Sequence, residues 1–213
     1  MHKIKSITAA VLIAIAAIGL SAPMASASVI LNVDATGQLT GAQNVDVNGI
    51  LFDVTFVDGS CVALFNGCND PGDFDFTDLS SALAASQALL DQVFIDTFLG
   101  AFDTDPARTS GCGGSGFDDQ CSVLTPVQRL PGSINVLVAG VQNRIGSTLA
   151  DFTFTQERNS TEDTSGTSGF APPRVTYGRW TRSTPAAVPE PGTWLLYLVG
   201  LALLAGFTRR RWA

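Results

Sequence analysis

The C-terminal end of the chain carries a long apolar run that stops at a cluster of charges. Residues 193–208 contain no charged side chain. Three arginines follow directly: Arg209, Arg210 and Arg211. As a helix the run would be about 24 Å long and apolar all the way round, somewhat short of a hydrocarbon core of about 30 Å. Snorkelling arginines and the flanking Trp194 and Trp212 extend its reach. We therefore predict a transmembrane helix with cytoplasmic arginines, in preference to a buried helix of a soluble domain.

A short motif with two prolines precedes this run. It consists of Val188, Pro189, Glu190 and Pro191. Both prolines lack an amide donor and fix φ, so the motif stays extended. The order of motif, apolar helix and terminal basic cluster closely resembles the PEP-CTERM sorting domain of Gram-negative bacteria. The resemblance covers residues 188–213 only. It implies recognition by an exosortase, a membrane enzyme thought to cleave at or near the motif, in cells that produce exopolysaccharide and form biofilms.

The N-terminal residues 1–27 have the three parts of a secretory signal peptide. Two lysines precede an apolar stretch at residues 7–20, and Ala25 and Ala27 form an A-x-A cleavage site. An uncleaved anchor is the alternative, but the apolar stretch is short. We expect an exported protein that is transiently anchored in the inner membrane by its C-terminal helix and then reaches the cell surface or extracellular matrix.

The two terminal signals divide the chain into a signal peptide, an exported domain at residues 28–181, a linker at 182–187 and the sorting signal. Between the signals lie seven arginines and eighteen acidic residues, a net charge of −11, with no lysine or histidine. Such an acidic surface argues against nucleic acid and anionic lipid as partners. The missing histidine and lysine exclude Ser-His-Asp and Cys-His triads and lysine nucleophiles from this domain.

Four cysteines lie in the exported domain: Cys61, Cys68, Cys112 and Cys121. An even number in an exported protein indicates disulfides. Of the three possible pairings we favour the two local ones, because each closes a short loop. A zinc site is the alternative, but neither pair has finger-like spacing and the domain has no histidine.

Alternating apolar residues predict about five strands. The clearest signal is Asn48-Gly49 between two apolar runs, which indicates a two-residue hairpin turn. The strand after this turn places Phe52, Val54 and Phe56 on one face. Further strands are expected at residues 28–34, 133–141, 149–156 and 174–181.

One long helix is expected at residues 79–99, where apolar side chains recur at helical spacing. Asp78 is its predicted N-cap, and Gly100 and Pro106 oppose continuation. Residues 103–125 read as a glycine-rich loop. The predicted fold class is therefore α+β, an antiparallel sheet of about five strands packed against one long helix.

Acidic loops carry the candidate chemistry. The aspartates before the helix offer oxygen ligands for calcium: Asp70, Asp73, Asp75 and Asp78. Their spacing does not fit an EF-hand loop, and capping of the helix is the simpler interpretation. The same residues, together with Asp118 and Asp119, are the candidates for a glycosidase carboxylate pair. Nothing in their spacing places two of them across a cleft, so no catalytic residue or cofactor is predicted.

We therefore expect a non-enzymatic structural or adhesive protein associated with exopolysaccharide or biofilm matrix. The alternatives are a carbohydrate-active enzyme that uses aspartates and a calcium-stabilised glycan-binding module. The expected partners are an exosortase, the membrane before processing, and exopolysaccharide. An Asn159-Ser160-Thr161 sequon is also present. It would be an acceptor in a eukaryotic secretory pathway, and in a bacterial chain we interpret it as accidental.

Overall fold

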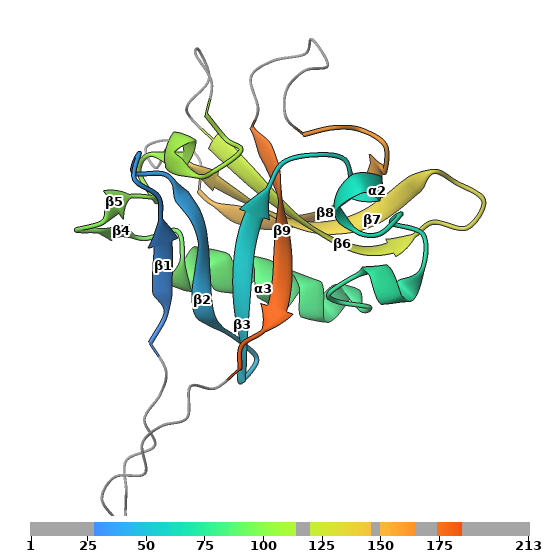
Figure 1. Ribbon diagram of the computed structural model, residues 1–213, viewed down its shortest axis with the longest axis horizontal. Helices are drawn as coiled ribbons and strands as arrows, with labels where there is room; N and C mark the ends of the chain where they lie inside the picture. The colour runs from blue at the N-terminus through green and yellow to red at the C-terminus, as the bar shows by residue number, and fades with distance from the viewer. Residues whose placement is uncertain (1–27, 114–119, 146–149, 165–173, 185–213) are drawn as a thin grey trace, which may run out of the picture. The chain divides into compact units, whose positions relative to one another are not determined.

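The computed structural model describes residues 28–113, 120–145, 150–164 and 174–184 (Figure 1). The chain divides into two units, Met1–Thr181 and Arg182–Ala213, and the described residues belong almost entirely to the first. The strands are β1 (Ile30–Val33), β2 (Leu39–Val47), β3 (Ile50–Val57), β4 (Asp96–Thr97), β5 (Gly100–Ala101), β6 (Gln120–Arg129), β7 (Asn135–Arg144), β8 (Phe152–Asn159) and β9 (Val175–Arg182). The helices are α2 (Cys61–Leu64) and α3 (Leu79–Gln92), with the short 3₁₀ turns η1 (Pro71–Asp73) and η2 (Pro106–Arg108).

The described chain is mostly β, so the predicted α+β class with about five strands and one long helix is wrong. Seven of the described strands form one sheet in the order β1-β2-β3-β9-β6-β7-β8, and β4 pairs with β5 in a separate hairpin. The sheet is mixed, because β6 and β9 run parallel while β6, β7 and β8 pair antiparallel. A purely antiparallel sheet was expected.

The last described strand, β9, lies in the middle of the sheet. It joins a meander of β1, β2 and β3 to a second meander of β6, β7 and β8 (Figure 1). Its Trp180 is buried against Phe52 and Phe76, with ring centroids 6.3 and 5.8 Å away, and its Nε1 donates to Thr125 Oγ1 at 3.1 Å. Among the described strands, β9 is therefore the one that pairs with both halves of the sheet.

The hairpin between β2 and β3 has the predicted turn. Asn48 and Gly49 have φ values of 55° and 84°, both positive as a type I′ turn requires. Phe52, Val54 and Phe56 are buried, as their alternation indicated. Local turn chemistry and alternation were sufficient here because both strands are contiguous in sequence.

Helix α3 begins where it was predicted and ends at Gln92, short of Leu99. Asp78 is the N-cap, and its Oδ1 accepts from the Ser81 amide at 2.8 Å. Beyond Gln92 the chain carries β-branched and aromatic residues of lower helix propensity: Val93, Phe94, Ile95 and Thr97. These residues lead into the β4–β5 hairpin instead, so an apolar run was mistaken for a continuing helix.

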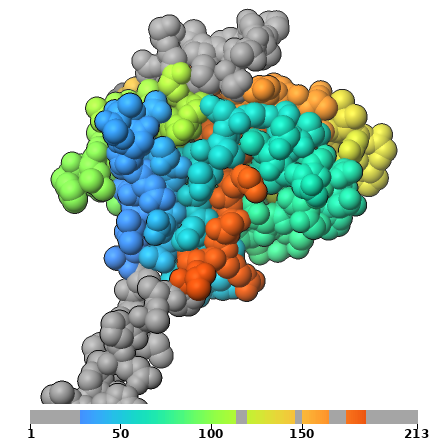
Figure 2. Space-filling model, in the orientation of Figure 1, coloured from blue at the N-terminus to red at the C-terminus, as the bar shows by residue number. Residues whose placement is uncertain are grey.

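The hairpin of β4 and β5 is held at its base by Asp96. Its Oδ1 accepts from the amides of Asp103 and Thr104 at 3.0 and 3.1 Å. The hairpin protrudes from the body at the left of Figures 1 and 2, and the Phe98 side chain in its turn is 97 % exposed. Hydrogen bonding at the base, rather than packing at the tip, stabilises this projection.

Strand β6 begins within residues 103–125, which were predicted as a loop, and continues to Arg129. A proline and a preceding glycine-rich segment hid it, because proline lacks the amide that a central strand uses. The register against β7 shifts between Pro126 and Gln128, so the proline lies at an irregularity of the ladder. Residues 121–127 are all buried, which is typical of a strand covered on both faces.

Two hydrophobic cores cover the two faces of the sheet. On one face α3 packs against β2, β6, β7 and β8, and Leu89 and Val93 are fully buried in the core that forms there. On the other face Cys61, Phe65, Cys68 and Phe74 cover β6, β7 and β9 around Tyr177. Figure 2 shows this second cover from outside, where the segment after β3 hides most of β6 and β7. We call the segment 60–74 the disulfide cover.

Candidate functional site

The two disulfides match the pairing that short loops favoured. Cys61 is bonded to Cys68 and Cys112 to Cys121, with Cα atoms 5.7 and 5.5 Å apart. The first bond closes α2 into the disulfide cover, and the second ties the segment after η2 to the start of β6. No free cysteine exists among them, so these sulfurs provide neither a nucleophile nor a metal ligand as they stand.

Three of the aspartates predicted as calcium ligands, Asp73, Asp75 and Asp78, accept hydrogen bonds from backbone amides. Asp73 accepts from the amides of Asn69 and Asp70, both at 3.0 Å, and from Asn66 Nδ2 at 3.0 Å. The amide of Asp70, followed by that of Asn69, lowers the pKa of Asp73. Together Asp70 and Asp73 form a capping box around η1. Asp73 therefore holds the shape of the disulfide cover.

The remaining two aspartates of that set act elsewhere. Asp75 accepts from the Trp180 amide at 2.7 Å, and burial raises its pKa against the opposing effects of that amide and Arg179. Asp78 caps α3, and hydrogen bonds from Ser80 and Ser81 lower its pKa to about 2. Among the described residues no group of three or more His, Cys, Asp or Glu side chains is arranged to hold a metal ion. A calcium site at these positions stays a prediction.

The carboxylate-pair candidates Asp118 and Asp119 lie outside the described residues. The structure instead brings together three aspartates that the sequence did not single out: Asp96, Asp103 and Asp151. Burial, followed by the charge of Asp151 and then that of Asp96, raises the pKa of Asp103. The three come from the β4–β5 hairpin, the segment after it and the chain before β8. No spacing rule connects such distant positions, so sequence alone had no signal for this cluster.

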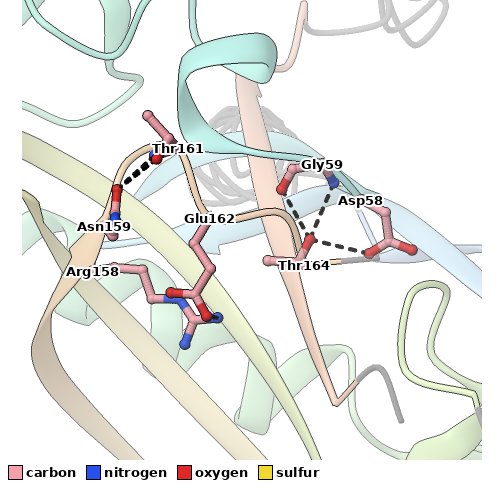
Figure 3. A network of polar contacts seen from close by, with 7 residues as sticks. All are labelled: Asp58, Gly59, Arg158, Asn159, Thr161, Glu162 and Thr164. Carbon is pink, nitrogen blue, oxygen red and sulfur yellow. Dashed lines mark hydrogen bonds and ion pairs between the residues drawn. The ribbon is translucent and has the colours of Figure 1, made fainter. Parts of the chain in front are cut away.

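A second polar network joins the end of β3 to the turn after β8 (Figure 3). Thr164 Oγ1 lies 3.1 Å from both the amide and the carbonyl oxygen of Gly59, and 3.4 Å from Asp58 Oδ1. The Thr164 amide donates to the Gly59 carbonyl at 3.1 Å. We call this network the Thr164 clasp. It connects residues 105 and 106 positions apart, which explains why no local pattern indicated it.

Burial raises the pKa of Asp58 within the clasp. The hydroxyls of Thr164 and Thr176 oppose this shift, and the charge of Asp163 adds to it. Thr176 Oγ1 also donates to the Val57 carbonyl at 3.0 Å. Both threonine hydroxyls near this carboxyl group also bond backbone carbonyls, Thr164 that of Gly59 and Thr176 that of Val57. This arrangement suits fixing the turn after β8 rather than proton transfer to a substrate.

The predicted processing sites all lie outside the described residues. These are Ala25 and Ala27 of the signal peptide, the Val188–Pro191 motif, the apolar helix and the basic residues Arg209 to Arg211. Within the described ranges, no helix has the length and hydropathy needed to cross a bilayer. The structure therefore leaves the predicted membrane helix and both cleavage sites untested.

Comparison with known proteins identifies the C-terminal signal. Residues 187–211 match the PEP-CTERM protein-sorting motif. No curated protein and no solved structure gives a significant match to the chain. The motif implies export and sorting to the cell surface by an exosortase, while the family of the β-rich body remains unassigned.

Proposed function

We propose that this exosortase-processed surface protein is a non-enzymatic structural or adhesive component of an exopolysaccharide or biofilm matrix. The observation that carries the proposal is the sorting motif at residues 187–211, because it directs the body to the cell surface. The composition of the body is consistent with that destination. It is strongly acidic, contains no lysine or histidine, and has its four cysteines in two disulfides.

The architecture supports a durable binding module more than a catalyst. Both faces of the central strands are covered, and the polar networks at Asp58, Asp73 and Asp78 are used for turns and helix ends. Disulfides that close short loops stabilise extracellular domains by restricting the unfolded chain. Such a domain persists outside the cell while presenting its surface to other matrix components.

The protruding β4–β5 hairpin favours contact with a matrix component. Phe98 and Leu99 form its turn, 97 % and 43 % exposed, and Asp96 and Asp103 lie at the base of the hairpin. An exposed aromatic ring gives a large contact area at low cost in conformational entropy. We assign the adhesive contact of the proposed function to this tip.

The test uses the purified mature protein and the exopolysaccharide of the producing cell, with and without calcium. We expect co-sedimentation without release of new reducing ends, weakened by Phe98→Ala and unchanged by Ile134→Ala, which removes an exposed apolar side chain from the β6–β7 turn. Release of reducing ends would favour the carbohydrate-active enzyme. Binding that needs calcium would favour the calcium-stabilised module, and no binding at all would contradict an adhesive role.

A further inference from the structure

The chain contains eight asparagines, and a single one of them begins an Asn-X-Ser/Thr sequon. That residue is Asn159, the last residue of β8, followed by Ser160 and Thr161. A sequon whose middle residue is not proline is the acceptor sequence for N-linked glycans. Its occurrence alone carries little weight, because short motifs arise by chance. The conformation of these three residues decides whether the acceptor is presented.

The asparagine side chain is exposed and held in one orientation by the third residue of the sequon. Asn159 Oδ1 accepts from the Thr161 amide at 3.0 Å and from Thr161 Oγ1 at 2.9 Å (Figure 3). Both Asn159 and Thr161 are exposed. Because the two bonds use Oδ1, the amide nitrogen Nδ2 takes part in neither of them. The threonine hydroxyl thus polarises the carboxamide through its oxygen. The nitrogen is not used in these two hydrogen bonds.

The middle residue anchors the sequon to the body. Ser160 is 1 % exposed, its amide donates to the Ile134 carbonyl at 3.1 Å, and its carbonyl accepts from the Val62 amide at 3.0 Å. The turn continues with Glu162, whose amide donates to the Asn159 carbonyl at 3.1 Å. A buried middle residue between two exposed ones displays the acceptor amide and the hydroxyl on the same outward turn. A bulky group on Nδ2 would therefore project away from both cores.

We propose that Asn159 is a glycan attachment site. In the modification, Asn159 Nδ2 would attack the anomeric carbon of a sugar carried as a glycosyl diphosphate on a lipid. The new C–N bond forms as the bond from that carbon to the diphosphate oxygen breaks. The lipid diphosphate leaves with the electron pair, and the proton lost from Nδ2 passes to a base of the glycosyltransferase. The proposal requires export, which the sorting motif implies, and does not depend on the matrix role proposed above.

The experiment uses the full chain, with both terminal signals, expressed in a cell that makes an exosortase and recovered from its surface fraction. Peptide mass spectrometry with electron-transfer fragmentation should place a sugar on the Asn159 nitrogen. The peptide that carries Asn48 is the internal control, because that asparagine is also exposed but begins no sequon. We expect Asn159→Gln and Thr161→Ala to lose the sugar and Thr161→Ser to keep it. An equal yield of the three variants in the surface fraction would show that each of them still folds.

Three results would overturn the proposal. One is recovery of the unmodified Asn159 peptide from the surface fraction of the wild-type protein. Another is a sugar on Thr161 or Ser160 oxygen instead of the Asn159 nitrogen. The third is full modification of Thr161→Ala, which would show that the hydroxyl bonded to Asn159 has no part in recognition. None of these results would bear on binding of exopolysaccharide by Phe98, so the two proposals fail separately.

Discussion

At the scale of single residues, the Thr164 hydroxyl joins the turn after β8 to the end of β3. It serves the amide and carbonyl of Gly59 and the carboxyl of Asp58, and its side chain is buried. Thr164→Val keeps the shape but removes that hydroxyl, which leaves the part-buried Gly59 amide without this partner. We expect a loss of about 1–3 kcal/mol in the free energy of unfolding, measured by urea denaturation of the mature protein.

Thr164→Ser is the matched control for this prediction. It keeps the hydroxyl and removes one methyl group, so the expected loss is about 1 kcal/mol or less. If Thr164→Val proved as stable as Thr164→Ser, the clasp would have no energetic role. The turn after β8 would then be held by its backbone hydrogen bonds alone.

Gly41 is the residue at which a side chain has no room. Its φ is +153°, and a Cβ there would overlap the Val54 carbonyl oxygen and approach Thr55 Cα to 3.0 Å. Backbone atoms of a paired strand cannot move aside as a flexible side chain can. We expect Gly41→Ala to lower the free energy of unfolding by at least about 2 kcal/mol. Gly72→Ala, where a Cβ meets nothing within 4 Å, should change it by less than about 0.5 kcal/mol. Equal effects in a thermal melt would contradict this account.

At the scale of elements, the start of α3 has a pH dependence with a definite sign. Asp78 has a pKa lowered to about 2 by the Ser80 hydroxyl and by hydrogen bonding with Ser81, from an ordinary value of 3.8. A lowered pKa means that the ionised form is favoured in the folded state. Its stabilising effect is therefore complete above the ordinary value and is lost as the pH falls towards about 2.

This pH dependence can be tested with two variants of the cap residue. Asp78→Ala should lower the melting temperature by a few degrees near neutral pH, and the difference from wild type should shrink in acid. Asp78→Asn keeps a cap oxygen without the titration, so it should retain most of the stability and show a flatter pH profile. A difference between wild type and Asp78→Ala that persisted unchanged in acid would contradict the capping role of the carboxylate.

The disulfide cover is the element whose removal should affect one face of the sheet alone. The double variant Cys61→Ala/Cys68→Ala removes a loop closure over a sequence separation of 7, which costs about 2–3 kcal/mol. We expect faster amide hydrogen exchange at Leu124 and Val138, next to the cover, and less change at Leu89 on the face packed by α3. The variant lacking Cys112 and Cys121 is the matched control, because its loop is of similar length.

The pairing itself is checked by mass spectrometry of unreduced peptides. A peptide that links Cys61 to Cys68 is expected. A link between Cys61 and Cys112 would rule out the disulfide cover as described. It would also join two loops that are each closed by their own disulfide in the structure.

At the scale of the whole molecule, the folded body lies very close in sequence to its processing signal. Strand β9 ends at Arg182, and the matched motif begins at residue 187. The residues between them can span at most about 18 Å when fully extended. Since β9 also joins both halves of the sheet, the body completes its fold only when the chain next to the signal is in place.

Replacing Pro189, Glu190 and Pro191 together by alanine should block processing. We expect the variant to accumulate in the membrane fraction at its unprocessed mass, as seen by immunoblotting and intact-mass measurement. Pro185→Ala removes a proline just outside the matched residues and should be processed normally. Normal maturation and release of the triple variant would remove the exosortase assignment for this chain.

The features that the sequence by itself determined are those that depend on residues close together in the chain. They are the sorting motif, the Asn-Gly hairpin, the cap at Asp78 and the two short disulfide loops. Each depends on the chemistry of a few adjacent side chains, so a short window contains the whole signal. The same reasoning extended α3 to Leu99 and missed β6, because apolar content within a short window does not distinguish helix, strand and loop.

Only the tertiary structure decided how distant segments meet. The parallel pairing of β6 and β9, the burial of both sheet faces and the contact of Thr164 with Asp58 join residues far apart in the chain. The same is true of the Asp96, Asp103 and Asp151 cluster. Their free energy comes from packing and from hydrogen bonds across the fold, which no local pattern specifies. For the same reason an accidental-looking sequon became a presented acceptor once Ser160 was seen buried between two exposed residues.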